Sequence, residues 1–190
     1  ITGNSIGAKL TIPQGTLFTD SSGNSWLSAR DVTWYSNVTT CKVPIIQHEK
    51  YTASALNNMV IPTGDRVIIH LGTLPNGKYY EQGSMSLQIG GETWVLVDTF
   101  AKSKPTDKHF MVSVDEALNP YIMFGDGTFG KKPAAGAKIT NVVFYLTNGT
   151  QGNVKSNTIT SVPSVISSSI TDATVSNAYD AGGGSNYENF

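Results

Sequence analysis

Residues 85–97 read MSLQIGGETWVLV, and this stretch decides the fold. Its apolar residues at positions 85, 87 and 89 alternate with polar ones, a period of two that is typical of a strand with one buried face. Gly90-Gly91 supplies two residues that tolerate positive φ, which predicts a tight hairpin turn. The Trp94–Val97 run that follows is apolar on both faces, so we expect a central strand covered on both sides.

Similar runs recur along the chain and are separated by turn signals. The other alternating runs are residues 67–71, 110–115 and 139–146, and the other turn signals are Asn76-Gly77, Asp126-Gly127 and Asn148-Gly149. In the first run Val67, Ile69 and Leu71 share one face, and Ile68 and His70 share the other.

Helical patterns are short and few. We expect helices only near Ala53–Met59 and Asp115–Leu118. The sequence therefore predicts an all-β fold, mainly antiparallel, built as a sandwich or partly closed barrel with long loops and little helix.

The composition changes after about Asn153. Residues 154–178 are rich in Ser, Thr and Val and poor in large apolar side chains, as expected of a linker or of an extended arm that adds strands to another sheet. Gly182–Gly184 predicts a flexible break. Ile1 is not an initiator methionine, and Tyr187–Phe190 resembles the start of a further region, so we expect the native protein to continue at both ends.

Charge and cysteine content narrow the function classes. Only 14% of the 190 residues are charged, against roughly 25% in typical soluble domains, and the net charge is −1. Lys131-Lys132 is the only basic pair, which argues against nucleic acid as a partner. No apolar run approaches the roughly 20 residues of a membrane span. Cys41 is the only cysteine, so an internal disulfide is impossible.

Residues 125–130 match the dinucleotide-binding pattern G-x-G-x-x-G. That chemistry needs a helix after the glycines and an acidic residue about 20 positions later, but Asp and Glu are absent between Gly127 and Thr171. We therefore interpret Gly125, Gly127 and Gly130 as a structural turn and expect no cofactor. In this interpretation Asp126 caps the turn, and Phe124 and Phe129 anchor it to the core.

Catalytic and metal-binding patterns are weak. The histidines His48, His70 and His109 have no metal-ligand spacing, a G-x-S-x-G nucleophile motif is absent, and Cys41 is interpreted as a packed residue. The acids Glu81, Glu92, Asp98 and Asp126 leave an acid pair for glycoside hydrolysis open. Trp26, Trp34, Trp94, Tyr79 and Tyr80 are interpreted as core and interface residues, although such side chains can also line a sugar platform.

One ordered set of motifs goes beyond composition. It comprises Gln88–Trp94, Phe110–Glu116, Tyr121–Gly130, then Pro133, Gly136, Ile139 and Tyr145, and finally Asn148–Asn153. Ile12–Phe18 and Gly182–Glu188 flank it. Together they resemble the baseplate J-like family, in particular the wedge subunit of contractile phage tail baseplates.

The resemblance implies a domain plan and a role. Residues 1–50 would pair with 154–181 as an outer β segment, 51–153 would form an inserted β-domain, and 182–190 would begin a truncated following region. The chain would be a non-enzymatic structural component of the virion, assembled in the host cytoplasm, whose partners are its own copies and other wedge proteins. It would have no catalytic, cofactor or metal residues. The alternative function is a carbohydrate- or receptor-binding β-module of a tail fibre or secreted protein, with a groove of exposed Trp and Tyr.

Overall fold

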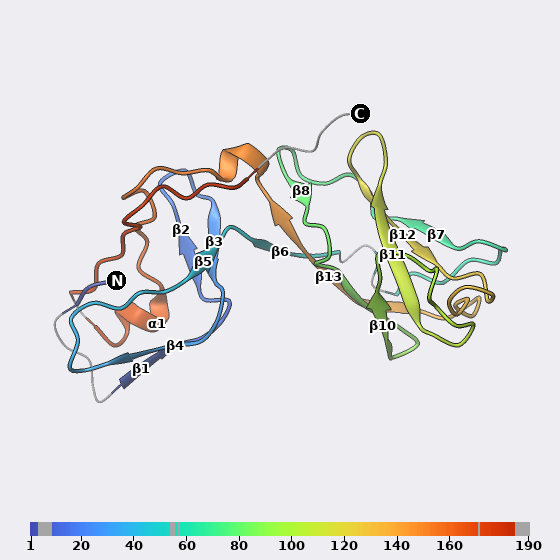
Figure 1. The fold of residues 1–190 in the computed structure, drawn as a ribbon, viewed down its shortest axis with the longest axis horizontal. Coiled ribbons are helices and arrows are strands. Elements are labelled where there is room, and N and C mark those ends of the chain that lie inside the picture. The colour runs from blue at the N-terminus through green and yellow to red at the C-terminus, as the bar shows by residue number, and fades with distance from the viewer. Residues whose placement is uncertain (4–8, 54–55, 57, 171, 185–190) are drawn as a thin grey trace. The chain divides into compact units, whose positions relative to one another are not determined.

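The computed structural model describes residues 1–3, 9–53, 56, 58–170 and 172–184 (Figure 1). The chain forms two compact units. Unit 1 contains residues 1–49 and 147–190, and unit 2 contains residues 50–146. The all-β prediction is confirmed. No helix in the described part of the chain is long and apolar enough to cross a membrane.

Unit 2 is built on a mixed sheet in the order β6-β13-β9-β10-β11-β12-β7, with β8 also paired to β13. Most neighbouring strands are antiparallel, while β10 and β11 run parallel. The strands are β6 (Glu49–Thr52), β7 (Ile68–His70), β8 (Tyr79–Tyr80), β9 (Ser86–Ile89), β10 (Glu92–Leu96), β11 (His109–Val114), β12 (Pro120–Phe124) and β13 (Ile139–Thr147).

The β9–β10 hairpin forms as expected. Ile89 pairs with Glu92 across Gly90 and Gly91, whose φ values are 59° and 80°. Positive φ at both central residues is what a two-residue hairpin loop with the right twist requires. The expected double cover of β10 is wrong, however: Trp94 is buried, but Val95 is 54% exposed on the other face. An apolar residue on a solvent-facing position is common, so the apolar run did not distinguish the two cases.

A β-bulge in β13 changes which residues face the core. The pairing of β13 with β9 shifts between Thr140 and Val143, and Asn141 has a φ of 54°. Ile139 and Val142, an odd and an even position, are therefore both buried. An extra residue in one strand reverses the alternation beyond it.

The core of unit 2 lies on one face of this sheet. Val67, Ile69, Leu87 and Ile89 are buried, as the alternating pattern predicts. The other fully or nearly buried side chains include Ile61, Tyr80, Met85, Trp94, Phe110, Ile122, Phe124, Phe144 and Leu146. Inward side chains from neighbouring strands thus form one continuous apolar cluster.

Unit 1 contains short strands from the first part of the chain. They are β1 (Lys9–Ile12), β2 (Leu17–Thr19), β3 (Ser25–Ser28), β4 (Val32–Tyr35) and β5 (Ile45–Ile46). β1 pairs with β4, and β3 lies between β2 and β5. A 3-10 turn, η2 (Gly149–Gly152), and one helical turn, α1 (Ser164–Ser167), come from the last part.

The Ser/Thr-rich C-terminal segment completes the core of unit 1. Ile159, Ile166, Ile170 and Val175 are buried in one cluster with Ile12, Phe18, Trp26 and Trp34. Isolated bridges join Thr2 to Thr174 and Asp20 to Ile159. Within unit 1, these residues are a packed part of the fold and not a free linker.

One of the two helix predictions is wrong, and the other falls partly outside the described residues. Asp115–Leu118 is a turn in which the Asp115 carboxylate accepts hydrogen bonds from the N–H groups of Ala117 and Asn119. The expected helix at Ala53–Met59 includes residues 54, 55 and 57, which lie outside the described residues. The helical turn at Ser164–Ser167 was not predicted.

A buried carboxylate organises the β2–β3 turn of unit 1. Asp20 accepts hydrogen bonds from the N–H groups of Ser22 and Asn24 at 2.8 and 2.9 Å, and from Asn24 Nδ2 and Trp26 Nε1 at 2.8 and 3.2 Å. Burial acts to raise the pKa of Asp20, but the hydrogen bonds from Asn24, Trp26 and Ser22 outweigh it and hold the pKa below its ordinary value.

We expect Asp20→Asn to destabilise unit 1 by roughly 1–3 kcal/mol at neutral pH, because an amide cannot accept all these bonds. A depressed carboxyl pKa stabilises the fold above the unfolded value near 4 and loses this effect as pH falls through the lower folded value. Urea unfolding of both forms should therefore show the wild-type advantage shrinking below about pH 4. Exposed Asp172→Asn is the control, and an advantage that stays constant in acid would contradict this account.

Candidate functional site

The glycine turn after β12 is the feature that the sequence singled out. Gly127 and Gly130 have φ values of 94° and 81°, and the Gly127 N–H donates to the Gly130 carbonyl at 3.0 Å. A Cβ on Gly125 would lie 2.3 Å from the carbonyl carbon and oxygen of Gly130. Gly127 and Gly130 thus supply left-handed backbone, whereas Gly125 allows two backbone segments to touch.

Asp126 caps this turn, as expected from its position. One carboxylate oxygen accepts the N–H groups of Thr128 and Phe129 at 2.8 and 2.9 Å. The hydrogen bond from Phe129, followed by that from Thr128, lowers the pKa of Asp126 below its ordinary value. The residues after Gly130 continue as a loop toward β13, so the helix N-terminus that a dinucleotide site needs does not follow in this described segment.

The two phenylalanines of the turn have different roles. Phe124 is buried, and its ring contacts Trp94 edge-on at a centroid distance of 5.4 Å. The expectation that Phe129 also anchors the turn to the core is wrong, because Phe129 is 55% exposed. The bonds that Asp126 makes fix the local backbone, so the turn does not need a second buried ring.

We expect Gly127→Val to destabilise unit 2 by roughly 1–3 kcal/mol, because a β-branched residue at a φ of 94° is strained. Thermal melting would measure the change. The neighbouring exposed substitution Thr128→Ala should change stability by less than about 0.5 kcal/mol. Equal effects of the two substitutions would show that the turn does not depend on positive φ.

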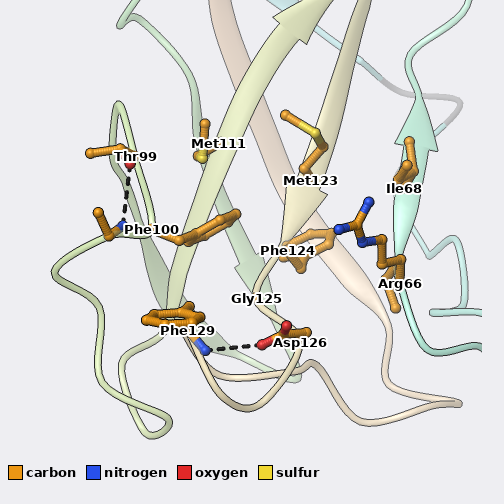
Figure 2. A pocket seen from close by; sticks show the side chains of 12 residues that line it. Arg66, Ile68, Thr99, Phe100, Met111, Met123, Phe124, Gly125, Asp126 and Phe129 are labelled. Carbon is orange, nitrogen blue, oxygen red and sulfur yellow. Dashed lines mark hydrogen bonds between the residues drawn. The ribbon is translucent and has the colours of Figure 1, made fainter.

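An apolar groove lies beside the turn on the outer face of the unit 2 sheet (Figure 2). Its volume is about 580 Å³. The residues that line it are Arg66, Val67, Ile68, Thr99, Phe100, Ala101, Met111, Met123, Phe124, Gly125, Asp126 and Phe129. We call it the Arg66 groove.

Strand register explains the floor of the Arg66 groove. Met111 on β11 pairs with Met123 on β12, and Met123 pairs with Ile68 on β7. Paired residues of neighbouring strands share a face, so these side chains form an apolar row across the sheet. Phe100 and Phe129 come from two loops and form walls (Figure 2). The sequence pattern placed Ile68 on the outer face, but alternation carries no information on which loops fold over that face.

A second hollow, of about 620 Å³, belongs to unit 1. Its lining includes Trp26, Gln47, Asn153 and five glycines, Gly149, Gly152, Gly182, Gly183 and Gly184. The Asn153 side chain accepts from the N–H and donates to the carbonyl of Gly184, both at 2.9 Å. Gly184, at the end of the segment for which the sequence predicted a flexible break, is therefore bonded to the residue that follows η2.

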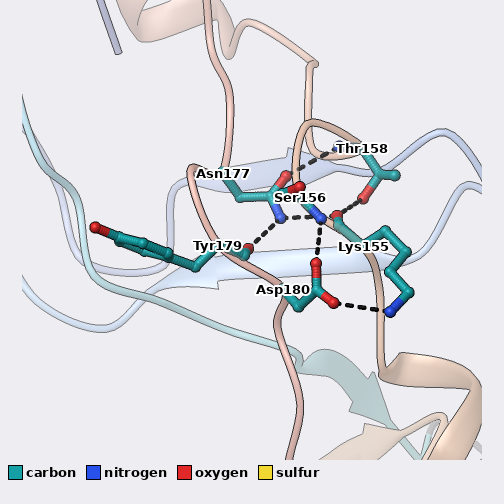
Figure 3. A network of polar contacts seen from close by, with 6 residues as sticks. All are labelled: Lys155, Ser156, Thr158, Asn177, Tyr179 and Asp180. Carbon is teal, nitrogen blue, oxygen red and sulfur yellow. Dashed lines mark hydrogen bonds and ion pairs between the residues drawn. The ribbon is translucent and has the colours of Figure 1, made fainter.

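A polar network fixes the chain just before that segment (Figure 3). Asn177 accepts the N–H groups of Thr158 and Ile159 and donates to the carbonyls of Lys155 and Tyr179. The Asp180 carboxylate binds the Lys155 ammonium at 2.8 Å, which, with the Ser156 N–H, lowers the pKa of Asp180. The network ties residues 155–159 to residues 177–180. Its carboxylate and its amide both bind groups of unit 1 itself, so we interpret the network as structural.

The remaining candidate side chains are dispersed. Among the residues that the structure describes, no group of three or more His, Cys, Asp or Glu side chains could hold a metal ion. The His70 ring contacts the Tyr121 ring in a tilted arrangement with a centroid distance of 5.4 Å, and His109 Nδ1 forms a hydrogen bond with the Ser103 hydroxyl at 2.8 Å. Cys41 is buried, and burial raises the pKa of its thiol, which disfavours the reactive thiolate.

The acidic and aromatic candidates occupy structural or exposed positions. Glu92 pairs with Lys108 at 2.6 Å, Asp98 is exposed, and Glu81 is partly buried after β8. Trp26, Trp34, Trp94 and Tyr80 are buried, and Tyr79 is partly buried. The buried tryptophans are therefore not available as the exposed sugar platform that the alternative function requires.

Comparisons with protein-family models, with curated proteins and with solved structures found no match to this chain.

Proposed function

We propose that this chain is a structural component of a contractile tail baseplate wedge, where it joins neighbouring subunits around the tail hub. The single observation that carries this proposal is the order of the motifs from Gln88 to Asn153, which resembles their order in the baseplate J-like family. Those motifs occupy β9, β10, β11, β12, the glycine turn, β13 and η2 in succession. The resemblance thus concerns one connected series of elements and not scattered residues.

The chemistry of the site supports the same role. The turn uses its glycines for backbone geometry and commits the Asp126 carboxylate to two N–H groups of the turn itself. A rigid turn with its polar groups satisfied internally serves to present a surface. In the proposed function the chain binds other proteins and turns over no substrate.

The surface composition also favours protein partners. A charged fraction of 14% gives a polar, nearly neutral exterior. Exposed apolar side chains are present in both units, including Leu17 and Tyr35 in unit 1 and Ile68 and Phe129 in unit 2. Protein interfaces combine apolar contacts with neutral hydrogen bonding in this way and are depleted of charge at their centres.

Electron microscopy of intact tail particles would test the proposal. A small affinity tag in the full-length protein, inserted at the Asn76-Gly77 turn, should be detected by antibody-gold at the baseplate, and untagged particles should show no label. The density at the labelled position should accommodate the two units. Label on the tail fibres, or particles that assemble without the chain, would contradict the wedge role, and saturable binding on a glycan array would then favour the alternative.

A further inference from the structure

Strand β7 ends the unit 2 sheet with an open edge. β12 borders it on one side, through the Leu71 N–H to the Pro120 carbonyl and the Phe124 N–H to the Val67 carbonyl. Backbone groups alternate in direction along a strand, so residues 67, 69 and 71 bond to β12 and the N–H and C=O groups of Ile68 and His70 point the other way. Within the described residues, no strand pairs with that outer edge.

The same strand borders the Arg66 groove. Arg66 and Ile68 are two residues apart and lie on the outer face, where Ile68 is 45% exposed. The apolar row continues from Ile68 to Met123 and Met111 and is walled by Phe100 and Phe129 (Figure 2). A strand placed next to β7 would therefore project alternate side chains beside Arg66 and toward this row.

Arg66 gives the edge a charge preference. Within the described part of the chain, its guanidinium has no carboxylate within 4 Å; its influence on Asp126 is a longer-range lowering of the pKa of that acid. The Asp126 carboxylate meanwhile accepts two backbone N–H groups. A guanidinium next to an apolar groove is complementary to a carboxylate that lies close to a large apolar side chain.

We propose that an extended acidic segment of a neighbouring protein adds to β7 as a further antiparallel strand. Its backbone pairs with Ile68 and His70, a bulky apolar side chain packs over Ile68 and Met123, and a carboxylate two residues later lies opposite Arg66. Strand addition takes its affinity from main-chain hydrogen bonds and its specificity from alternate side chains. This inference deepens the proposed function and rests on it, because it defines the kind of segment that a neighbouring subunit supplies.

A synthetic peptide can test the strand addition directly. The probe is acetyl-Ser-Thr-Phe-Thr-Glu-Thr-Ser-amide, with Phe and Glu two apart, and its partner probe carries Lys in place of Glu. Nuclear magnetic resonance of the ¹⁵N-labelled chain should show the Glu probe shifting the amide signals of Ile68 and His70 and those around Met123.

Two variants separate charge from backbone pairing. Arg66→Glu should lower the affinity for the Glu probe by roughly three- to tenfold and raise the affinity for the Lys probe to a similar extent. Ile68→Pro should abolish binding, because it removes an edge N–H that does not bond to β12, while Ile68→Val should bind normally. Circular dichroism and melting of each variant would verify that unit 2 remains folded; an Ile68→Pro variant that unfolds leaves the Arg66→Glu charge exchange as the deciding measurement.

Each other outcome overturns the proposal. Shifts confined to Phe100, Met111 and Phe129 would mean that the groove accepts an apolar group without strand addition. No shift at about 1 mM probe, or no exchange of preference in Arg66→Glu, would exclude the acidic strand. These measurements use the isolated chain, so they are independent of the baseplate labelling. A peptide that does not bind leaves the wedge role intact if the tagged chain is found in the baseplate. Absence of the tagged chain from the baseplate would in turn leave the peptide result unaffected.

Discussion

Gly125→Ala is expected to destabilise unit 2 by about 3 kcal/mol or more. Gly125 is outside the left-handed region, so the cost is steric: the new Cβ would lie 2.3 Å from the carbonyl carbon and oxygen of Gly130. Those atoms are backbone, and Gly130 is itself hydrogen-bonded to Gly127. The turn cannot move away without losing that bond, and the result should be a large drop in the melting temperature of unit 2.

Gly182→Ala is the matched control for this substitution. Gly182 also has no positive φ, and a Cβ there would meet nothing within 4 Å. The free energy of unfolding of the Gly182→Ala variant should stay within about 0.5 kcal/mol of the wild-type value. If Gly125→Ala melts like Gly182→Ala, the close approach of Gly125 to Gly130 is not a feature of the folded protein.

Ile166→Ala is expected to destabilise unit 1 by roughly 2–5 kcal/mol. Ile166 is fully buried in α1 and belongs to the cluster that includes Ile12, Trp26 and Trp34. Truncation removes apolar contact and leaves a cavity. Chemical denaturation monitored by tryptophan fluorescence would measure the loss, since Trp26 and Trp34 lie in the same cluster.

The control lies on the same helical turn. Ser167 is exposed, and Ser167→Ala should change stability by less than about 0.5 kcal/mol. A small effect of Ile166→Ala would mean that the helical turn does not contribute to the core of unit 1, as expected if residues 154–178 were the linker that composition left open.

Sequence alone predicted the elements whose pattern is local. Alternation identified the inner faces of β7 and β9, and Gly90-Gly91 identified the hairpin that joins β9 to β10. In the turn after β12, the pattern predicted the capping by Asp126 and the need for flexible backbone at Gly127 and Gly130. Each of these depends on a few neighbouring residues, so the signal is present in the sequence.

What sequence reasoning missed depends on distant parts of the chain. Val95 is apolar but faces outward, and the bulge at Asn141 shifts the phase of β13 relative to β9. The role of Gly125 is a contact with Gly130 that no propensity describes. Ile166 was missed because the few apolar residues of this Ser-rich segment, Val162, Val165, Ile166 and Ile170, lie in and around a helical turn of only four residues.

The floor and walls of the Arg66 groove show the same limit. Met111, Met123 and Ile68 come together through the pairing of three strands, and Phe100 and Phe129 arrive from separate loops. The outward position of Phe129 contradicted the expected anchor, and the same exposure makes it available as a wall of the groove. The sequence signal for the groove was the position of Ile68 on the strand face opposite Val67 and Ile69.

Unit 1 is built from two segments that are far apart in the sequence, and this arrangement has a consequence for biosynthesis. Its core joins Ile12–Trp34 to Ile159–Val175, and unit 2 lies between these segments in the sequence. At a translation rate of about 5–20 residues per second, the N-terminal segment of unit 1 is synthesised on the order of ten seconds before the C-terminal segment that completes its core. Unit 2 can fold while the chain is still attached to the ribosome. During that interval, Phe18, Trp26 and Trp34 of the nascent β1–β5 segment lack the apolar side chains of residues 159–175 that bury them in the folded protein. Nascent chains stalled between unit 2 and Ile159 should therefore be the species that chaperones recognise most strongly.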